Sequence, residues 1–161
     1  MCGVTGNWGR GFAANQLHSS LAALAHRGPD DVGEYLDSAT GVMLGHRRLS
    51  IIDLSPAGHQ PMVSDDGNVV ISYNGEIYNY RDLRAELQAG GRVFRSDSDT
   101  EVLLRLYQSE GIAMLPRLNG IFAFALYDRR SGELLLVRDG FGVKPMYYGE
   151  HADGIRFASE I

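Results

Sequence analysis

Cysteine is almost absent from this chain, which has one among 161 residues, Cys2. A single thiol forms no internal disulfide and cannot supply a thiolate zinc site. The histidines show no H-E-x-x-H or comparable ligand spacing; they are His18, His26, His46, His59 and His151. The N-terminus also lacks the basic and apolar regions of a secretory signal. We therefore expect no metal site and a cytoplasmic location.

Lysine is equally scarce, since Lys144 is alone and the formal net charge is -5. Nucleic-acid binding depends on clustered lysine and arginine, so this composition argues against it. No apolar run approaches the roughly 18 residues that a membrane span needs. Neither a Walker A loop nor G-x-G-x-x-G is present. We expect no nucleic-acid or membrane partner and no cofactor in this part of the protein.

The remaining composition is that of one globular domain covering 1–161, with 44% hydrophobic and 22% charged residues. Periodicity and caps predict helices at 15–27 and 79–88, and a third that starts at or just after Ser98. The segment 49–61 is expected to be a loop over a sheet. Strands are expected at 4–8, 32–36, 42–47, 62–63, 69–73, 121–127, 133–137, 146–148 and 155–158. This order predicts an α+β fold of hairpin-built antiparallel sheets covered by amphipathic helices.

Cys2 stands directly behind the initiator methionine. Removal of Met1 would place the thiol beside a free α-amine on the same residue. The amine titrates at about 7.7 to 8.0 and the thiol at about 8.5, so the amine can accept the thiol proton. The alternative is a small buried residue that opens a strand.

Asn74-Gly75 is the commonest hairpin-turn dipeptide, and on its own it more often closes a turn than binds a ligand. Here a strand enters it and a helix follows, so we expect a turn at a strand end. A glycine N–H and an asparagine NH₂ that converge on one point would form an oxyanion hole.

Arg48 and Asp99 are candidates for binding charged groups, although each also has a structural interpretation. In the structural interpretation, Arg48 is a solvated charge at a strand end, and Asp99 does no more than stabilise the first turn of a helix. Arg47 would point to the opposite face from Arg48, so at most one of the two arginines enters a given cavity. The segments 26–30 and 138–142 are expected to be structural, the first ending a helix and the second closing a hairpin.

Several long motifs occur in order from the first residue to the last. They are MCG at 1–3, HRGPDD at 26–31, GHRRLSIIDLSPAGHQPM at 45–62, YNGEIYNYRDLR at 73–84, SDSDTE at 96–101, LNGIFAFALYD at 118–128, RDGFGVKPMYY at 138–148 and FASEI at 157–161. Together they resemble the class II, N-terminal-nucleophile glutamine amidotransferase domain. The likeness is strongest to the N-terminal domain of glutamine-hydrolysing asparagine synthetase. The resemblance implies a four-layer αββα sandwich.

The resemblance also implies roles by position. Cys2 would be the nucleophile with its α-amine as base, and Asn74 with the Gly75 N–H would form the oxyanion hole. The substrate, glutamine, would be held by the remaining matched positions, namely Arg48 at the α-carboxylate, backbone groups of Leu49, Ser50, Ile51 and Ile52, and Glu76 and Asp99 near the α-ammonium.

The synthetases of this family continue into an ATP-pyrophosphatase domain with an S-G-G-x-D-S loop, which this sequence lacks. We expect that domain, with its ATP and magnesium, to be missing by truncation and to be the partner on the same chain. Other amide-forming enzymes for polysaccharides or peptides carry a similar amidotransferase half, so the sequence leaves the identity of the amide acceptor open. It also leaves open whether the protein forms a homodimer. A self-processing amidohydrolase and a catalytically silent scaffold are the rival interpretations.

Overall fold

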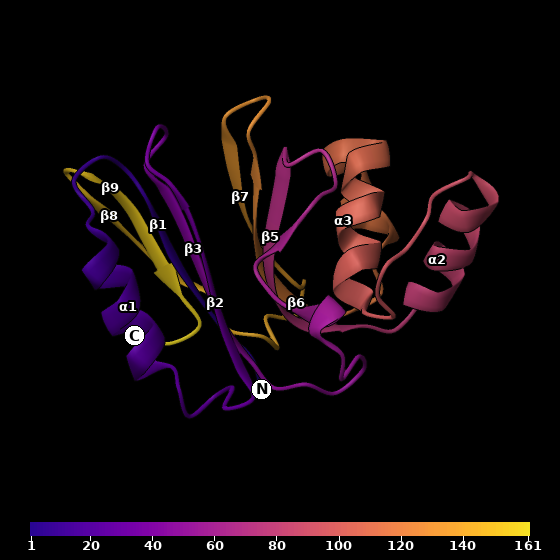
Figure 1. Ribbon diagram of the computed structural model, residues 1–161, viewed down its shortest axis with the longest axis horizontal. Helices are drawn as coiled ribbons and strands as arrows, with labels where there is room; N and C mark the ends of the chain where they lie inside the picture. Colours follow the sequence, from indigo (N-terminus) through magenta and orange to yellow (C-terminus); the bar gives the residue numbers. More distant parts are fainter.

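The computed structural model describes residues 1–161 and contains two antiparallel sheets that lie face to face (Figure 1). The five-stranded sheet has the order β2-β3-β1-β9-β8 and consists of β1 (Gly3–Trp8), β2 (Asp31–Asp37), β3 (Val42–Arg48), β8 (Tyr147–His151) and β9 (Gly154–Ala158). The four-stranded sheet has the order β4-β5-β6-β7 and consists of β4 (Met62–Val63), β5 (Val69–Ile77), β6 (Gly120–Asp128) and β7 (Glu133–Arg138).

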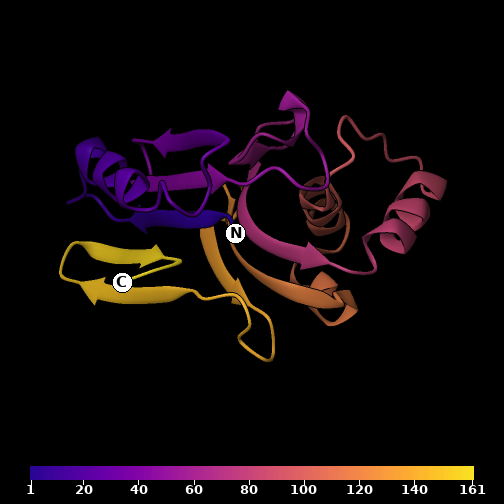
Figure 2. The ribbon, with the colours of Figure 1, turned by 90° about the horizontal axis from the view of Figure 1, so that it is seen from below.

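Helices cover the outer faces of both sheets. Helix α1 (Ala14–Ala23) packs on β1 and β3, while α3 (Asp99–Glu110) packs on β5 and α2 (Tyr80–Ala89) packs on α3. Figures 1 and 2 show these layers from two directions, with α1 on one side of the sheets and α2 and α3 on the other. The α+β class and the αββα sandwich are therefore confirmed. No helix combines the length and the apolar character needed to cross a membrane.

Two apolar cores follow from the alternation of side chains along the strands. Val4 and Leu44 of the five-stranded sheet meet Val70 and Tyr127 of the other sheet, and all four are fully buried. The opposite face of β5 packs with the buried residues of α3 in a second cluster. The inner faces are thus filled with apolar side chains along most of their length, and Ser72 and Asn74 of β5 are among the few buried polar residues on them.

The expected turn at Asn74-Gly75 is wrong. Strand β5 runs straight through both residues, and β6 pairs with it in register, Asn74 opposite Ala123 and Gly75 opposite Phe122. A Cβ on Gly75 would lie 2.4 Å from the Ile121 carbonyl oxygen, so glycine here permits close strand approach instead of a turn. The partner strand is far away in the sequence, which is why the local pattern resembled a turn.

Two other boundaries differ from the sequence-based expectations. Helix α1 ends at Ala23 instead of residue 27, and beyond its end the buried side chain of Arg27 binds Glu160 and the Cys2 carbonyl. The segment 138–142 does not close a hairpin, since β7 and β8 belong to different sheets. Short 3₁₀ helices at Pro56–Gly58 and Gly111–Arg117 were not predicted.

Candidate active site

A cavity of about 180 Å³ opens where the ends of the two sheets meet, next to the N-terminus. Figure 2, which views the molecule from below, shows the N-terminus between the strands of the two sheets. Eight of the ten predicted site residues line this cavity, namely Cys2, Arg48, Leu49, Ile51, Ile52, Asn74, Gly75 and Asp99. The other two, Ser50 and Glu76, lie outside the lining, and Glu76 is exposed.

Cys2 lies just ahead of β1 and shares the inward direction of Val4, the residue two positions on. Its Sγ contacts the Leu49 backbone, at 3.4 Å from the nitrogen and 3.6 Å from the oxygen. Burial raises the pKa of the Cys2 thiol, although the hydrogen bond from Leu49 opposes this shift. A thiol in this state needs a nearby base to form the thiolate near neutral pH.

The backbone of Cys2 is fixed by two motifs from opposite ends of the sequence. The Arg27 Nε donates to the Cys2 carbonyl at 2.9 Å, and its Nη1 pairs with Glu160 at 2.6 Å. Ser159 accepts from the Val4 N–H through its Oγ, at 2.9 Å. Arg27, which lies in a segment expected to be structural, thus helps to hold the proposed nucleophile in place, and no local pattern in the sequence indicated this.

Every second residue of β5 points inward, and Asn74 lies on the same inner face as Val70 and Ser72. Asn74 therefore faces the cavity. Its side chain is 2% exposed, and its Nδ2 has no hydrogen-bond partner. Buried side-chain donors are nearly always paired, so an unpaired donor beside a thiol indicates a site that a ligand oxygen completes.

Arg48 and Arg47 point to opposite faces of β3, as the sequence predicted. The Arg47 Nε donates to the Leu21 carbonyl of α1, while Arg48 turns inward and lines the cavity. The Arg48 Nη1 donates to the Ser55 carbonyl at 3.1 Å, and Nη2 donates to the Asp53 carbonyl. Three N–H groups of the guanidinium remain for a ligand.

Asp99 is the first residue of α3, and Ser98 caps that helix by accepting from the Glu101 N–H at 3.3 Å. The Asp99 carboxylate accepts from the Tyr73 hydroxyl at 2.6 Å and from the Ile77 N–H at 3.1 Å. Burial raises the pKa of Asp99, and these hydrogen bonds counteract part of that shift. These hydrogen bonds therefore fix the orientation of the Asp99 carboxylate at the cavity.

Sequence reasoning missed several lining residues. Gln60 accepts from the Tyr73 N–H at 2.7 Å and donates to the Thr100 hydroxyl at 3.2 Å, so it joins the loop to both β5 and α3. The sole lysine, Lys144, also lines the cavity, with its Nζ 3.3 Å from the Met1 sulfur. Each reaches the cavity through long-range packing, which neither spacing nor periodicity reveals.

Comparison with known proteins gives matches over the whole chain. A family model described as a glutamine amidotransferase domain matches residues 1–161. Asparagine synthetase [glutamine-hydrolyzing] 2 of Bacillus subtilis is 40% identical over 100% of this chain and 22% of its own length. Amidase chry2 of Gibberella zeae is 41% identical over 91% of this chain and 22% of its own length. The chain thus spans about a fifth of these relatives.

A solved structure also matches. It is the glutamine phosphoribosylpyrophosphate amidotransferase of B. subtilis complexed with ADP and GMP, with a TM-score of 0.83, 25% identity, and coverage of 98% of this chain and 42% of that one. The family match over the full chain, the 40% identical relative and the shared fold all lead to one assignment. The chain belongs to the glutamine amidotransferase domain family.

Proposed function

We propose that this domain hydrolyses glutamine to glutamate and ammonia, with Cys2 as the nucleophile. The observation that carries the proposal is the buried, unpartnered Asn74 amide in the cavity that Cys2 lines. With the Gly75 N–H, it would stabilise the oxyanion that forms when a thiolate attacks a carboxamide. A scaffold domain without catalysis would have no need for a buried unpaired donor next to its only thiol.

The reaction would proceed in two steps. After removal of Met1, the Cys2 α-amine takes the thiol proton, and Sγ attacks the carboxamide carbon of glutamine. The C–N bond breaks, the departing nitrogen takes the proton from the ammonium, and ammonia leaves a γ-glutamyl thioester. Water then attacks the thioester carbon, the C–S bond breaks, and glutamate and the thiol are released.

The charges around the cavity suit a zwitterionic substrate. Glutamine carries one anion and one cation at one end and an amide at the other. Arg48 would pair with the α-carboxylate and Asp99 with the α-ammonium, with the Leu49 to Ile52 backbone assisting. Ser50 and Glu76 remain assigned to substrate binding through the family resemblance alone. A self-processing amidohydrolase acting on an uncharged amide would leave Arg48 and Asp99 without ligand charges to match.

We further propose that the ammonia passes to an ATP- and magnesium-dependent synthetase domain on the same, longer chain. Aspartate is the proposed acceptor, because the Bacillus subtilis relative is an asparagine synthetase. The single cysteine, which rules out an internal disulfide, supports a cytoplasmic location for this activity.

A second candidate keeps the glutaminase reaction but changes the acceptor. The relative named Amidase chry2 is as similar in sequence as the asparagine synthetase, at 41% compared with 40% identity. Amide formation on another carboxylate is therefore the alternative. An assay of the full-length protein with ATP, glutamine and aspartate would distinguish the two acceptors, since asparagine forms only if aspartate is the acceptor.

Covalent labelling tests the glutaminase proposal directly. A glutamine-mimicking electrophile should label Cys2 alone, and excess glutamine should block the labelling. Cys2→Ala should remove both labelling and glutaminase activity while the unfolding midpoint stays unchanged, since the thiol lies at the chain end. Cys2→Ser should be nearly as inactive, because an alcohol is a far weaker nucleophile at neutral pH. Glutaminase activity at the normal rate in either variant would contradict the mechanism.

A further inference from the structure

The loop that follows Arg48 is organised around the side chain of Asp53. The Asp53 Oδ1 accepts from the Ser55 N–H at 2.8 Å, which closes a tight turn over 53–55. Both outer carbonyls of this turn accept from the Arg48 guanidinium. The position of the Arg48 charge therefore depends on the shape of the Asp53 turn.

The second oxygen of the same carboxylate binds the backbone of the segment that leads into α3. The Asp53 Oδ2 accepts from the Asp97 N–H at 2.9 Å, and Asp97 lies two residues before Asp99. Between them, Ser98 caps α3. One carboxylate thus joins the turn that holds Arg48 to the segment that leads into Asp99.

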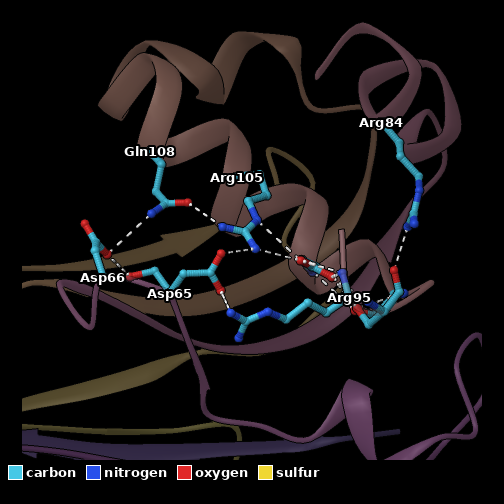
Figure 3. Close-up of polar contacts among 10 residues, drawn as sticks. Asp65, Asp66, Arg84, Arg95, Arg105 and Gln108 are labelled. Carbon is cyan, nitrogen blue, oxygen red and sulfur yellow. Dashed lines mark hydrogen bonds and ion pairs between the residues drawn. The ribbon is translucent and has the colours of Figure 1, made fainter. Parts of the chain in front are cut away.

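The segment 95–98 is itself rigidly held from the side away from the cavity. The buried Glu101 accepts from the Ser96 N–H at 2.7 Å and the Arg95 N–H at 3.0 Å, and it pairs with Arg105 at 3.1 Å. Figure 3 shows these contacts, with Arg84 approaching the same segment from α2. Asp53 therefore binds to a fixed support and not to a free loop.

No other hydrogen bond joins residues 49–59 to the segment that leads into α3. Leu49 bonds to Cys2, Ser50 to Asp30 and His59 to Asp31, all on the side of the five-stranded sheet. The next bond toward α3 comes from Gln60, at the far end of the loop. Without the Asp53 carboxylate, the 53–55 turn would have no hydrogen bond to the wall that carries Asp99.

The Asp53 carboxylate is suited to this role because it stays ionised. It is 9% exposed, and although burial acts to raise its pKa, the hydrogen bonds from Ser55 and Asp97 lower it below the ordinary value. A charged acceptor makes stronger hydrogen bonds than a neutral one. Its oxygens are directed to N–H groups, so they do not occupy the guanidinium of Arg48.

From these contacts we infer that Asp53 is a positioning residue that sets the separation between Arg48 and Asp99, and so matches the site to the α-amino acid end of the substrate. This inference rests on the proposed glutaminase function. It predicts that Asp53 acts through substrate binding, because the Cys2 thiol and the Asn74 amide are held by other contacts.

The test compares Asp53→Ala and Asp53→Asn with the unsubstituted protein, in samples shown to begin at Cys2. In Asp53→Ala the KM for glutamine should rise about tenfold or more, while kcat should change by less than about threefold. Labelling by the glutamine-mimicking electrophile should slow by a similar factor, whereas iodoacetamide, which carries no α-amino acid group, should react at an unchanged rate. Asp53→Asn keeps the volume and one acceptor oxygen, so its effect should be smaller.

Asp66→Ala is the matched control. Asp66 also closes a turn, by accepting from the Ser64 hydroxyl at 2.6 Å and the Asn68 N–H at 3.2 Å, but it does not line the cavity. It should alter the unfolding midpoint without changing KM. The midpoints of all variants are measured, and Asp53→Asn serves for the kinetics if the alanine variant does not fold.

The outcomes separate the two proposals. If the unsubstituted protein neither reacts with the electrophile nor hydrolyses glutamine, the proposed function fails. If it does both and the KM of the Asp53 variants is unchanged, the function stands and the positioning role is wrong. Equal losses of kcat and of iodoacetamide reactivity would also overturn the role, because they would indicate general damage to the site.

Discussion

Asn74 illustrates at the scale of one residue how a functional group differs from a stabilising one. Its NH₂ is buried without a partner, an arrangement that is unfavourable for folding by about 1 to 3 kcal/mol. Arg48 and Asp99, in contrast, make hydrogen bonds in the same structure without a ligand. The unpaired amide therefore suits an oxygen that becomes negative only during the reaction.

This difference predicts a kinetic split between the site residues. Asn74→Ala should lower kcat by about 10²- to 10³-fold with little change in KM, because the donor becomes strong only when the oxyanion develops. Arg48→Ala and Asp99→Ala should chiefly raise KM, since each charge pairs with the substrate in both ground and transition states. Steady-state glutaminase kinetics measure both effects, and a pure KM change in Asn74→Ala would disprove its oxyanion role.

His46 gives a residue-scale prediction for stability. It is fully buried, and burial lowers its pKa from the ordinary value to about 4. Between about pH 6.5 and 4 the unfolded state holds the proton and the folded state does not, so the free energy of unfolding falls as pH falls. The stability that the neutral His46 contributes is fully present above pH 6.5 and amounts to roughly 3 kcal/mol.

His46→Gln should remove that slope. The amide can still donate to the Tyr73 carbonyl, which the His46 Nε2 contacts at 2.9 Å, but it does not titrate. Denaturant unfolding at several pH values would give the free energy of unfolding as a function of pH for both proteins. The difference between the two curves is the contribution of His46, because the carboxylates contribute equally to both. Parallel curves for the two proteins would contradict the assignment of a neutral buried histidine.

Among the elements, the β5–β6 pair carries the proposed oxyanion donors, Asn74 and Gly75. Gly75 lies next to Asn74 in β5, and its hypothetical Cβ would meet backbone atoms of Ile121 and Phe122 at 2.4 and 2.7 Å. Backbone cannot yield to a side chain as a flexible neighbour would. The spacing of the two strands, and so the direction of the Asn74 side chain, depends on this glycine.

Gly75→Ala should therefore destabilise the fold by about 1 to 3 kcal/mol and also lower kcat. Gly140→Ala is a suitable control, because no atom lies within 4 Å of its Cβ position. The free energy of unfolding of Gly140→Ala should stay within about 0.5 kcal/mol of that of the unsubstituted protein, and the variant should keep its glutaminase activity. Thermal unfolding and glutaminase assays on both variants provide the comparison, and equal behaviour of the two would refute the close-packing argument.

At the scale of the whole molecule, the site exists because two sheets from separate parts of the chain converge at one end. The proposed nucleophile lies just ahead of β1, the guanidinium of Arg48 is at the end of β3, the Asn74 amide is in β5 and the Asp99 carboxylate is in α3. Met1 also lines this cavity, and its sulfur lies 3.3 Å from Lys144. An intact Met1 thus places its side chain in the cavity that the proposed nucleophile, Cys2, lines.

N-terminal processing should therefore decide activity without affecting folding. A peptide bond at the Cys2 nitrogen replaces a basic amine with a non-basic amide, so protein that retains Met1 should fold but hydrolyse no glutamine. Removal of Met1 should restore activity. Intact-mass spectrometry with a parallel assay tests this, and full activity with Met1 present would require another base. His46 is poorly placed to be that base, since it is buried and does not line the cavity.

Local sequence signals were enough to predict most of the helices and strands and most of the residues that line the candidate site. Strand alternation separated Arg48 from Arg47, the cap at Ser98 located Asp99, and the motifs identified the αββα family fold, because each of these signals is local or lies in a continuous motif. Three features became visible only in the folded chain: Asn74-Gly75 lies within a strand, Arg27 and Glu160 hold Cys2, and Asp53 joins the loop after Arg48 to the segment before α3. These contacts join residues 25 to 133 positions apart in the sequence, and only packing of the complete fold brings such groups within hydrogen-bonding distance.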